Sequence, residues 1–167
     1  MPNGLVISDA GPIFSLAIIS RLDILDSLFE NVVIPKAVWD EITVLKSVPH
    51  YTYIESYFKN KVRNITGPNN LHFVMDYGES EALLLYKELD ANFLLIDDKK
   101  ARDIAENLGI QCVGTLGVLS AAKSKDLIPD LKPIFEIFLA QKRYYSLNIL
   151  NSVLRKHGEE EITDYFI

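Results

Sequence analysis

The sequence predicts an α/β fold built around a mostly parallel sheet. Short apolar runs of strand length alternate along the chain with longer segments in which apolar residues recur at helical spacing. Two of the runs end in carboxylates: residues 5–8 precede Asp9, and residues 93–96 precede Asp97 and Asp98. Strands that alternate with helices favour a parallel sheet with helices covering its faces. In such sheets the carboxyl ends of the strands meet at one edge, where binding sites lie.

The first third of the chain is predicted as strand, two helical segments and strand. The strand covers residues 5–8, and Pro12 suits the first turn of the helix that follows, because its missing N–H is not needed there. Apolar residues keep helical spacing to Ile19, and a second amphipathic segment spans residues 22–29. Residues 32–34 are predicted to form a short buried strand that Pro35 ends.

A helix is predicted over residues 36–46, and one acidic residue in it is out of place. Val38, Ile42 and Leu45 form an apolar stripe, and Glu41 falls between them on the buried side. An unpaired buried carboxylate is costly, so Glu41 would need a cation, an arginine or a metal as its partner. The other interpretation is a glutamate at the margin of the stripe whose carboxylate reaches water. The pattern alone leaves both open.

The remaining elements follow the same alternation. We expect a helix with an aromatic face within residues 48–62, followed by a loop over 64–76. After the loop, helices are expected over 77–89, 99–108 and 116–125, and strands over 93–96 and 110–113. Asp98 and Thr115 are predicted N-caps. Thr115 also falls at the same sheet edge as the acids. Two helices, 131–142 and 147–157, are expected near the C-terminus, and the acids at 159–161 are predicted to be frayed and solvated.

Composition sets broad limits on function. With 167 residues, 49% of them hydrophobic, we expect one domain over 1–167, including C-terminal helices from about 131 to 157. No apolar run approaches the roughly 18–20 residues that cross a bilayer, and no basic segment precedes an apolar one as in a signal peptide. Cys112 is the only cysteine, which excludes an internal disulfide and a thiolate zinc cluster and suits a reducing cytoplasm. The net charge of −6 counts against a nucleic-acid partner unless bound cations offset it.

The acids at the predicted sheet edge suggest a metal site. Asp9 and the Asp97-Asp98 pair end strands, and Glu79 or Glu81 could join them, although either could simply favour a helix N-terminus. Carboxylates gathered at one place repel one another unless a divalent cation lies between them, and such oxygen ligands suit Mg²⁺ or Mn²⁺. These ions support phosphodiester hydrolysis without a histidine base. The three histidines have no ligand spacing and are interpreted as incidental: His50, His72 and His157.

Several short motifs, in their order and spacing, resemble those of PIN-domain proteins. They are Val6-Ile7-Ser8-Asp9-Ala10-Gly11-Pro12, Arg21-Leu22-Asp23-Ile24-Leu25, Val33-Ile34-Pro35-Lys36-Ala37-Val38, Gly78-Glu79-Ser80-Glu81-Ala82, Leu95-Ile96-Asp97-Asp98 and Gly114-Thr115-Leu116-Gly117-Val118-Leu119. The G-E-x-E-A and I-D-D patterns match the DUF3368 branch, which is similar to VapC-type toxins. The resemblance extends from Val6 to about His157.

The resemblance implies a three-layer α/β sandwich with a sheet of four to five strands and a Mg²⁺- or Mn²⁺-dependent ribonuclease acting on single-stranded or structured RNA. It further implies a homodimer that acts as the toxin of a toxin–antitoxin pair. Its expected protein partner is a small antitoxin, and no association with a membrane is expected.

The resemblance also assigns residues. Its acidic pocket falls on Asp9, Glu41, Glu81 and Asp98, with Asp9, Glu81 and Asp98 as metal ligands and Asp97 as the alternative to Asp98. Residues expected to bind substrate are Lys99, Lys100, Arg102 and Thr115. One position departs from the family pattern, because Gly11 replaces the small hydroxyl residue usual two positions after the first aspartate.

Three other readings of the sequence are possible. A PIN scaffold with weak or no catalysis could bind RNA or protein instead. A phosphoacceptor receiver domain also gathers acids at a sheet edge, but it needs the acid pair after the first strand and the single aspartate later, which is the reverse of the order here. A phosphatase of the D-x-D type would need an acid at position 11, where this chain has glycine.

Overall fold

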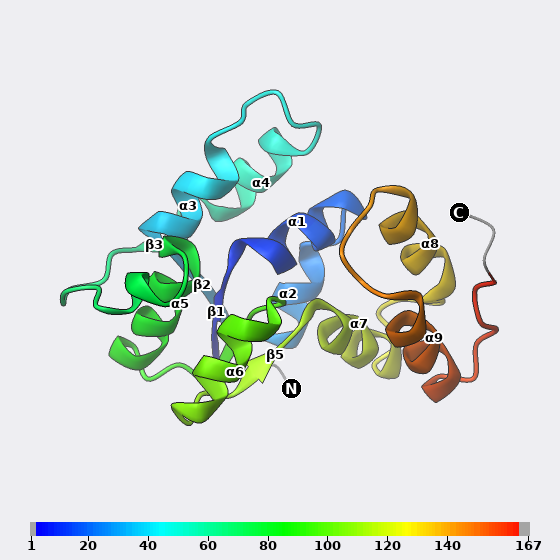
Figure 1. The fold of residues 1–167 in the computed structure, drawn as a ribbon. Coiled ribbons are helices and arrows are strands. Elements are labelled where there is room, and N and C mark those ends of the chain that lie inside the picture. The colour runs from blue at the N-terminus through cyan, green and yellow to red at the C-terminus, as the bar shows by residue number, and fades with distance from the viewer. Residues whose placement is uncertain (1–2, 164–167) are drawn as a thin grey trace. The chain divides into compact units, whose positions relative to one another are not determined.

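The structure, a computed structural model, describes residues 3–163 (Figure 1). The chain forms two compact units, the first ending at Thr115 and the second beginning at Leu116. Each unit is described separately.

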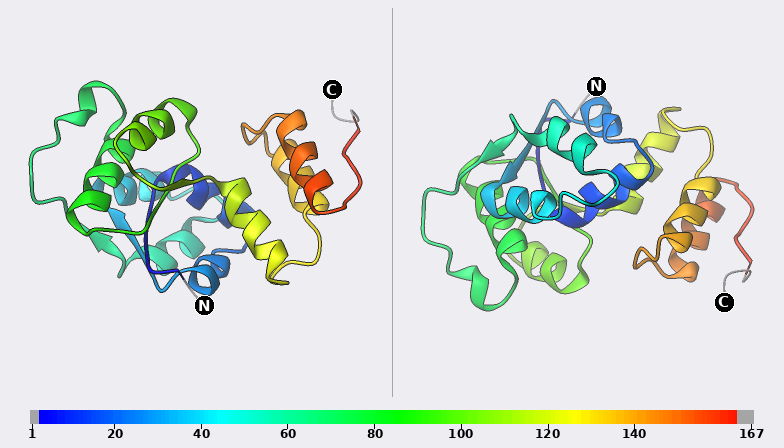
Figure 2. Two further views of the ribbon diagram at one scale, coloured as in Figure 1. Left: turned by 90° about the horizontal axis from the view of Figure 1, so that it is seen from below. Right: turned by 90° about the horizontal axis from the view of Figure 1, so that it is seen from above.

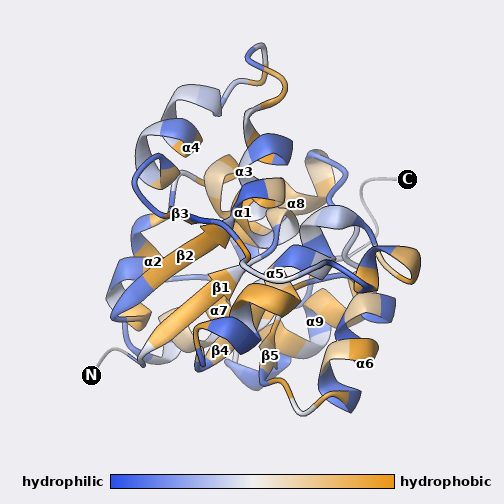
Figure 3. Cartoon of the chain, turned by 90° about the vertical axis from the view of Figure 1, so that its left-hand side faces the viewer, coloured by the Kyte–Doolittle hydropathy of each residue, from blue (hydrophilic) through white to orange (hydrophobic). Residues whose placement is uncertain are grey.

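The first unit is built on a five-stranded parallel sheet. Its strands lie in the order β3-β2-β1-β4-β5, with β1 in the centre. They are β1 (Leu5–Ser8), β2 (Asn31–Pro35), β3 (Val62–Arg63), β4 (Phe93–Leu95) and β5 (Cys112–Val113). Strands β1 and β2 are hydrophobic over most of their length (Figure 3), as expected for strands covered on both faces. The predicted parallel α/β sheet is confirmed. The two-residue strand β3 was not predicted, because it does not form an apolar run in the sequence.

Six α-helices and one 3-10 helix connect these strands. They are α1 (Ala10–Ile18), α2 (Asp23–Leu28), α3 (Lys36–Thr43), α4 (Tyr51–Phe58), η1 (Leu71–Phe73), α5 (Tyr77–Glu88) and α6 (Lys99–Asn107). Helix α1 begins two residues before Pro12, which keeps that proline within the first turn. Helix α3 ends earlier than predicted, and Leu45 beyond it is 60% exposed, so the buried stripe stops at Ile42.

The order of the strands explains where the helices lie. From the neighbouring strands β1 and β4 the chain crosses outward in opposite directions, to β2 and to β5. Because parallel crossovers are right-handed, the helices of these two connections cover opposite faces of the sheet. On one face, Ile7 packs in a buried cluster with Leu83 and Leu85 of α5 and with Ala101 and Ala105 of α6. Helix α2 contacts β2. The result is the predicted three-layer arrangement.

The same topology makes the carboxyl ends of β1 and β4 the point at which the strand order reverses. Ser8 lies opposite Leu95 in the register of these strands. Asp9 directly follows β1, and its backbone N–H donates to the carbonyl of Leu95 at 2.9 Å. Such a reversal point in strand order is where α/β sheets bind ligands. Asp97 and Asp98 follow β4 at the same edge.

The second unit is helical. Helix α7 runs from Thr115, the last residue of the first unit, to Ser124, and is followed by α8 (Lys132–Ala140) and α9 (Leu147–Lys156). Helices α8 and α9 lie side by side in two further views (Figure 2). Phe135 and Phe138 of α8 and Leu150 and Leu154 of α9 are fully buried. No helix within residues 3–163 is long and apolar enough to cross a membrane.

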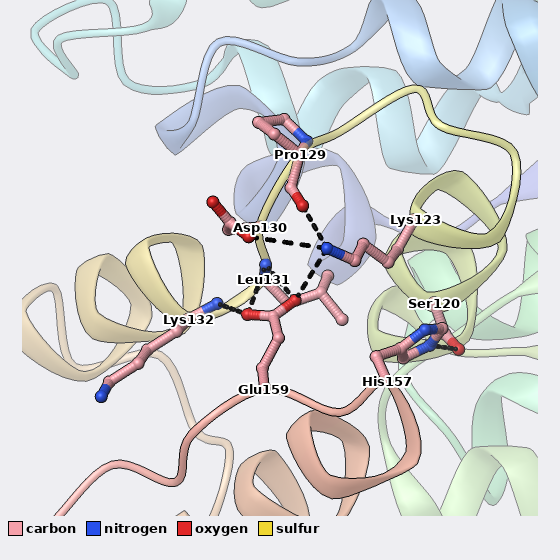
Figure 4. Close-up of polar contacts among 8 residues, drawn as sticks. All are labelled: Ser120, Lys123, Pro129, Asp130, Leu131, Lys132, His157 and Glu159. Carbon is pink, nitrogen blue, oxygen red and sulfur yellow. Dashed lines mark hydrogen bonds and ion pairs between the residues drawn. The ribbon is translucent and has the colours of Figure 1, made fainter.

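The prediction that residues 159–161 are frayed and solvated is wrong for Glu159, whereas Glu160 and Glu161 are exposed. The Glu159 carboxylate accepts hydrogen bonds from the backbone N–H groups of Leu131 and Lys132 at 2.9–3.0 Å, and it forms an ion pair with Lys123 at 3.3 Å (Figure 4). These N–H groups have no partner within α8, so Glu159 caps the start of that helix. The polar segment is therefore fixed by a contact 28 residues away in the sequence.

Candidate active site

Asp9 occupies the centre of the sheet edge. It holds the N-cap position of α1, but its side chain makes no capping hydrogen bond, and the residue is only 8% exposed. Burial raises the pKa of this carboxyl to about 8; the backbone hydrogen bond of Ala10 lowers it, while the charges of Glu41, Glu79 and Asp76 raise it further. A buried carboxyl in a field of other carboxyls favours either a proton or a cation.

Gly78 marks the point at which three acids converge. Oxygens of the carboxylates of Glu41, Asp9 and Asp76 lie 2.8, 3.4 and 3.6 Å from the position that a β-carbon on Gly78 would take. Any side chain at residue 78 would collide with the Glu41 carboxylate. The glycine therefore allows acids from three separate segments to approach one another.

Glu41 lies at the rim of this group rather than on the buried side of α3. The residue is exposed, which agrees with a glutamate at the margin of the stripe. Its pKa is nevertheless raised, first by partial burial of the carboxyl and then by the charge of Asp76. Within residues 3–163, neither Glu41 nor Asp9 has a lysine or arginine partner.

Asp76 and Glu79 begin α5 with a reciprocal capping box. The Asp76 carboxylate accepts from the N–H of Glu79 at 2.7 Å, and the Glu79 carboxylate accepts from the N–H of Asp76 at 3.3 Å. Burial and then the charge of Asp76 raise the pKa of Glu79 to about 7, and Asp98 and Glu41 add to the rise. Sequence reasoning missed Asp76, although an acid three residues before a glutamate at a helix start is the signature of this motif.

Glu81 lies on the same face of α5 as Gly78, because residues three apart are neighbours on a helix. Its carboxylate accepts from the backbone N–H of Ala37 at 3.3 Å, in the first turn of α3. Ala37 precedes Glu41 by one helical turn on α3. Glu81 is thus half-buried beside the converging acids, but its carboxylate contacts a helix N-terminus.

The two aspartates after β4 have different roles. Asp98 is the N-cap of α6, as predicted, and accepts from the N–H of Ala101 at 2.9 Å. Asp97 accepts from the N–H and the hydroxyl of Thr115 at 2.7 and 2.6 Å. The prediction of Thr115 as an N-cap is therefore wrong: it is the first residue of α7, and its hydroxyl is used by Asp97. A β-carbon on Gly11 would lie 3.6 Å from Asp97, an ordinary contact.

The basic residues expected to bind substrate lie on α6, immediately after Asp98. Lys99 pairs with Asp103 at 2.7 Å, and Arg102 pairs with Glu106 at 3.3 Å. Lys100 is exposed. Arg102 lies beside Asp97 at Gly114, because its guanidinium and the Asp97 carboxylate are each 3.1 Å from the position of a β-carbon on that glycine.

A family model described as a PIN domain, DUF3368, matches residues 5–159, which includes most of both units. The chain belongs to the PIN-domain family. PIN domains are generally nucleases, and they typically use divalent metals. The match confirms the resemblance that the motifs indicate.

Among solved structures, this PIN domain is similar to a PilT N-terminus domain protein from the hyperthermophilic archaeon Sulfolobus solfataricus P2. The two are 18% identical with a TM-score of 0.46, over 72% of this chain and 93% of the other. No curated protein matches the chain.

The carboxylates at the sheet edge of this PIN domain are chemically suited to a hard divalent cation. Among residues 3–163, their side chains are not arranged around a metal position. The convergent groups are all carboxylates, which Mg²⁺ and Mn²⁺ prefer. Within the part of the chain that the structure describes, no three His, Cys, Asp or Glu side chains are placed to hold a metal ion. Burial first, and then neighbouring carboxylates, raise the pKa values of Asp9, Glu41 and Glu79, and within residues 3–163 none of the three forms an ion pair with a lysine or arginine. A cation would supply that charge and draw the side chains together.

Proposed function

We propose that this PIN domain is a Mg²⁺- or Mn²⁺-dependent endoribonuclease that hydrolyses single-stranded or structured RNA. The observation that carries the proposal is the convergence of Asp9 and Glu41 on Gly78, at the carboxyl edge of the sheet, with no lysine or arginine paired to either among residues 3–163. We further propose that it acts as the toxin of a toxin–antitoxin pair, as a homodimer that a small antitoxin protein binds. This part rests on the resemblance to VapC-type toxins.

The residues proposed to hold the cation are Asp9, Glu81 and Asp98. Asp9 is the central ligand, since it is buried and its side chain is not used to cap α1. The Glu81 contact with the N–H of Ala37 is long at 3.3 Å and can be exchanged for a stronger partner. Both carboxylate oxygens of Asp97 accept hydrogen bonds from Thr115, whereas Asp98 accepts one from Ala101 through Oδ1, so Asp98 is the preferred second aspartate. When bound, a divalent ion polarises the phosphodiester and lowers the pKa of water, the chemistry that hydrolysis needs.

Glu41 is proposed as the general base, the group that accepts a proton during hydrolysis. Its raised pKa makes the carboxylate a stronger base than an ordinary glutamate, and its Oε2 atom faces the space shared with Asp9. Arg102, which lies beside Asp97, is proposed to contact the negatively charged phosphate backbone of the RNA. Lys99 and Lys100 add positive charge at the start of α6.

The test is a cleavage assay on labelled single-stranded RNA with Mn²⁺ or Mg²⁺, comparing the unmodified protein with Asp9→Asn. We expect cleavage that a chelator stops and that Asp9→Asn abolishes. Asp90→Asn is the matched control: Asp90 is exposed with a φ of 49°, a conformation that asparagine tolerates, so its activity should be unchanged. Cleavage that survives in Asp9→Asn would refute the assignment. No cleavage and no cation binding would favour the non-catalytic scaffold.

A second pair of variants separates the two glutamates of α5. Glu81→Gln removes a proposed ligand and should reduce cleavage strongly, while its fold is preserved because an amide oxygen can still accept from Ala37. Glu79→Gln keeps an acceptor for the capping box with Asp76 and should retain most activity. The reverse ranking would assign the third ligand to Glu79.

A further inference from the structure

Three aromatic rings lie together around the start of α5, and two of them belong to exposed residues. The His72 and Tyr77 rings are stacked, with centroids 5.1 Å apart and planes 8° from parallel, and the Phe73 ring lies 4.0 Å from His72. Phe73 is 81% exposed and Tyr77 is 61% exposed. Tyr77 is the first residue of α5 and stands between Asp76 and Gly78 in the sequence. We call His72, Phe73 and Tyr77 the aromatic platform.

The exposure of these rings is fixed by the surrounding structure. The side chain of Asn69 accepts from the N–H groups of Leu71 and His72 at 3.1 and 3.2 Å, and it donates to the buried hydroxyl of Ser80 at 2.8 Å. Leu71 and Met75, on either side of Phe73, pack into the core cluster beneath α5. Asn69 therefore links the start of η1 to α5, and Leu71 and Met75 anchor both sides of the helix in the core. Phe73, between them, remains exposed.

From this arrangement we propose that the aromatic platform stacks an unpaired base of the RNA next to the bond that is cleaved. The inference rests on the proposed ribonuclease function and names a positioning site for it. A flat ring offers a binding surface to any base, whereas the base edges of a duplex are paired and its faces are already stacked. Stacking on Phe73 or Tyr77 would therefore select single strands and place the adjoining phosphate near Asp76 and Gly78. Because stacking tolerates every base, it would add little sequence preference.

The test is binding of a fluorescein-labelled, single-stranded RNA to the Asp9→Asn protein, in which cleavage does not interfere. Phe73→Leu keeps an apolar side chain but removes the ring, and Phe73→Tyr keeps the ring. We expect Phe73→Leu and Tyr77→Leu each to weaken binding by about tenfold, as loss of one base–ring stack does, while Phe73→Tyr binds normally. Tyr144→Leu, at a 99% exposed tyrosine of the second unit, is the matched control and should have no effect.

A strand of equal length that lacks its bases gives a second readout. It should bind weakly and equally to all the variants, because its phosphates remain but its stacking surface is gone. In the active background, Phe73→Leu should raise KM and leave kcat nearly unchanged. The high exposure of Phe73 leaves this variant folded, which its melting temperature will verify.

The outcomes distinguish this inference from the function on which it rests. If the unmodified protein cleaves RNA but Phe73→Leu and Tyr77→Leu alter neither affinity nor KM, the platform is refuted and the ribonuclease stands. If ring-dependent binding is found without any cleavage, the platform stands and the ribonuclease fails. If the substitutions instead change the sedimentation of the protein alone, the rings form a contact between copies of the chain, and the inference is overturned.

Discussion

The Asp97 carboxylate accepts two hydrogen bonds from Thr115, 18 residues further along the chain. The backbone N–H lies 2.7 Å from Oδ1, and the hydroxyl lies 2.6 Å from Oδ2. Thr115 is fully buried. Hydrogen bonds to a carboxylate are stronger than neutral ones, so this pair fixes the end of β4 against the first residue of α7. Asp97 thus has a structural role at the end of β4, in addition to the capping of α6 by Asp98.

Removal of this hydroxyl should destabilise the protein. Thr115→Val keeps the shape and the N–H of the residue but loses one bond to a charged acceptor, so we expect the free energy of unfolding to fall by about 1.5–3 kcal/mol. Thr115→Ser restores the hydroxyl and should lie close to the unmodified protein. Urea denaturation of the three proteins measures the difference. Equal stability of Thr115→Val and the unmodified chain would show that the hydroxyl contributes nothing.

Asp9 should make the metal-free protein less stable as pH rises. Its pKa is about 8 in the folded chain against 3.8 for a free aspartate, so between these values the folded state holds a proton that the unfolded state has lost. The contribution to stability is therefore complete below about pH 4 and disappears by about pH 8. Asp9→Asn removes this dependence.

Thermal melts in chelator across pH 4–8 measure the effect. At pH 4 the Asp9→Asn and unmodified proteins should melt together, and at pH 8 the variant should melt several degrees higher, since one pKa unit corresponds to about 1.4 kcal/mol. Asp90→Asn, at an exposed position, should show no such divergence. A difference that is constant with pH would mean that Asp9 titrates normally.

Gly78→Ala should impair cation binding although alanine is the better helix former. The new β-carbon would lie 2.8 Å from the Glu41 carboxylate and 3.4 Å from that of Asp9, the proposed central ligand, so the Glu41 carboxylate must shift and the β-carbon fills space beside Asp9. Mn²⁺ at 100 times its Kd stabilises the folded protein by about 2.7 kcal/mol, and this rise in melting temperature should be largely lost in the variant. Gly67→Ala, whose β-carbon would have its nearest neighbour at 3.7 Å, should keep the full rise. An unchanged response in Gly78→Ala would refute convergence on this glycine.

Glu159 should stabilise the second unit through the start of α8. Its carboxylate satisfies the N–H groups of Leu131 and Lys132, and Glu159→Ala leaves them without that acceptor, at a cost of about 1–2 kcal/mol. Hydrogen exchange at these two amides should accelerate. Glu160→Ala removes a neighbouring glutamate whose side chain is 93% exposed and should leave the exchange unchanged. Slow exchange in both variants would contradict the capping role.

Glu159 also predicts an effect of acid. Burial raises its pKa, but the N–H groups of Leu131 and Lys132 together with Lys123 outweigh burial, and the pKa lies below the usual 4.5. The stabilisation is therefore present above about pH 4.5 and is lost as pH falls through the lower value in the folded protein. As pH decreases, hydrogen exchange at the same two amides should become faster in the unmodified chain, after correction for the intrinsic exchange rate. Protection that persists in strong acid would count against the capping role.

Much of the fold was predictable because it depends on local patterns. Apolar runs before Asp9 and Asp97 form β1 and β4, Asp98 caps α6, and parallel strands bring their carboxyl ends to one edge. Strand β3 could not be predicted, since two residues carry no periodicity, and it forms by pairing with β2. The position of Glu41 at the rim depends on where α3 ends, and Leu45 shows that the apolar pattern continues past the buried helix.

The sequence by itself determined the alternation of strands and helices, the family and the presence of acids after β1 and β4. Only the tertiary structure decided which acids share one space: it brings Glu41 and Asp76 beside Asp9 at Gly78, directs Glu81 to Ala37 and gives Asp97 to Thr115. The reason is physical. Strand and helix propensities act over a few neighbouring residues, whereas the field at a buried carboxyl is set by the packing of segments tens of residues apart.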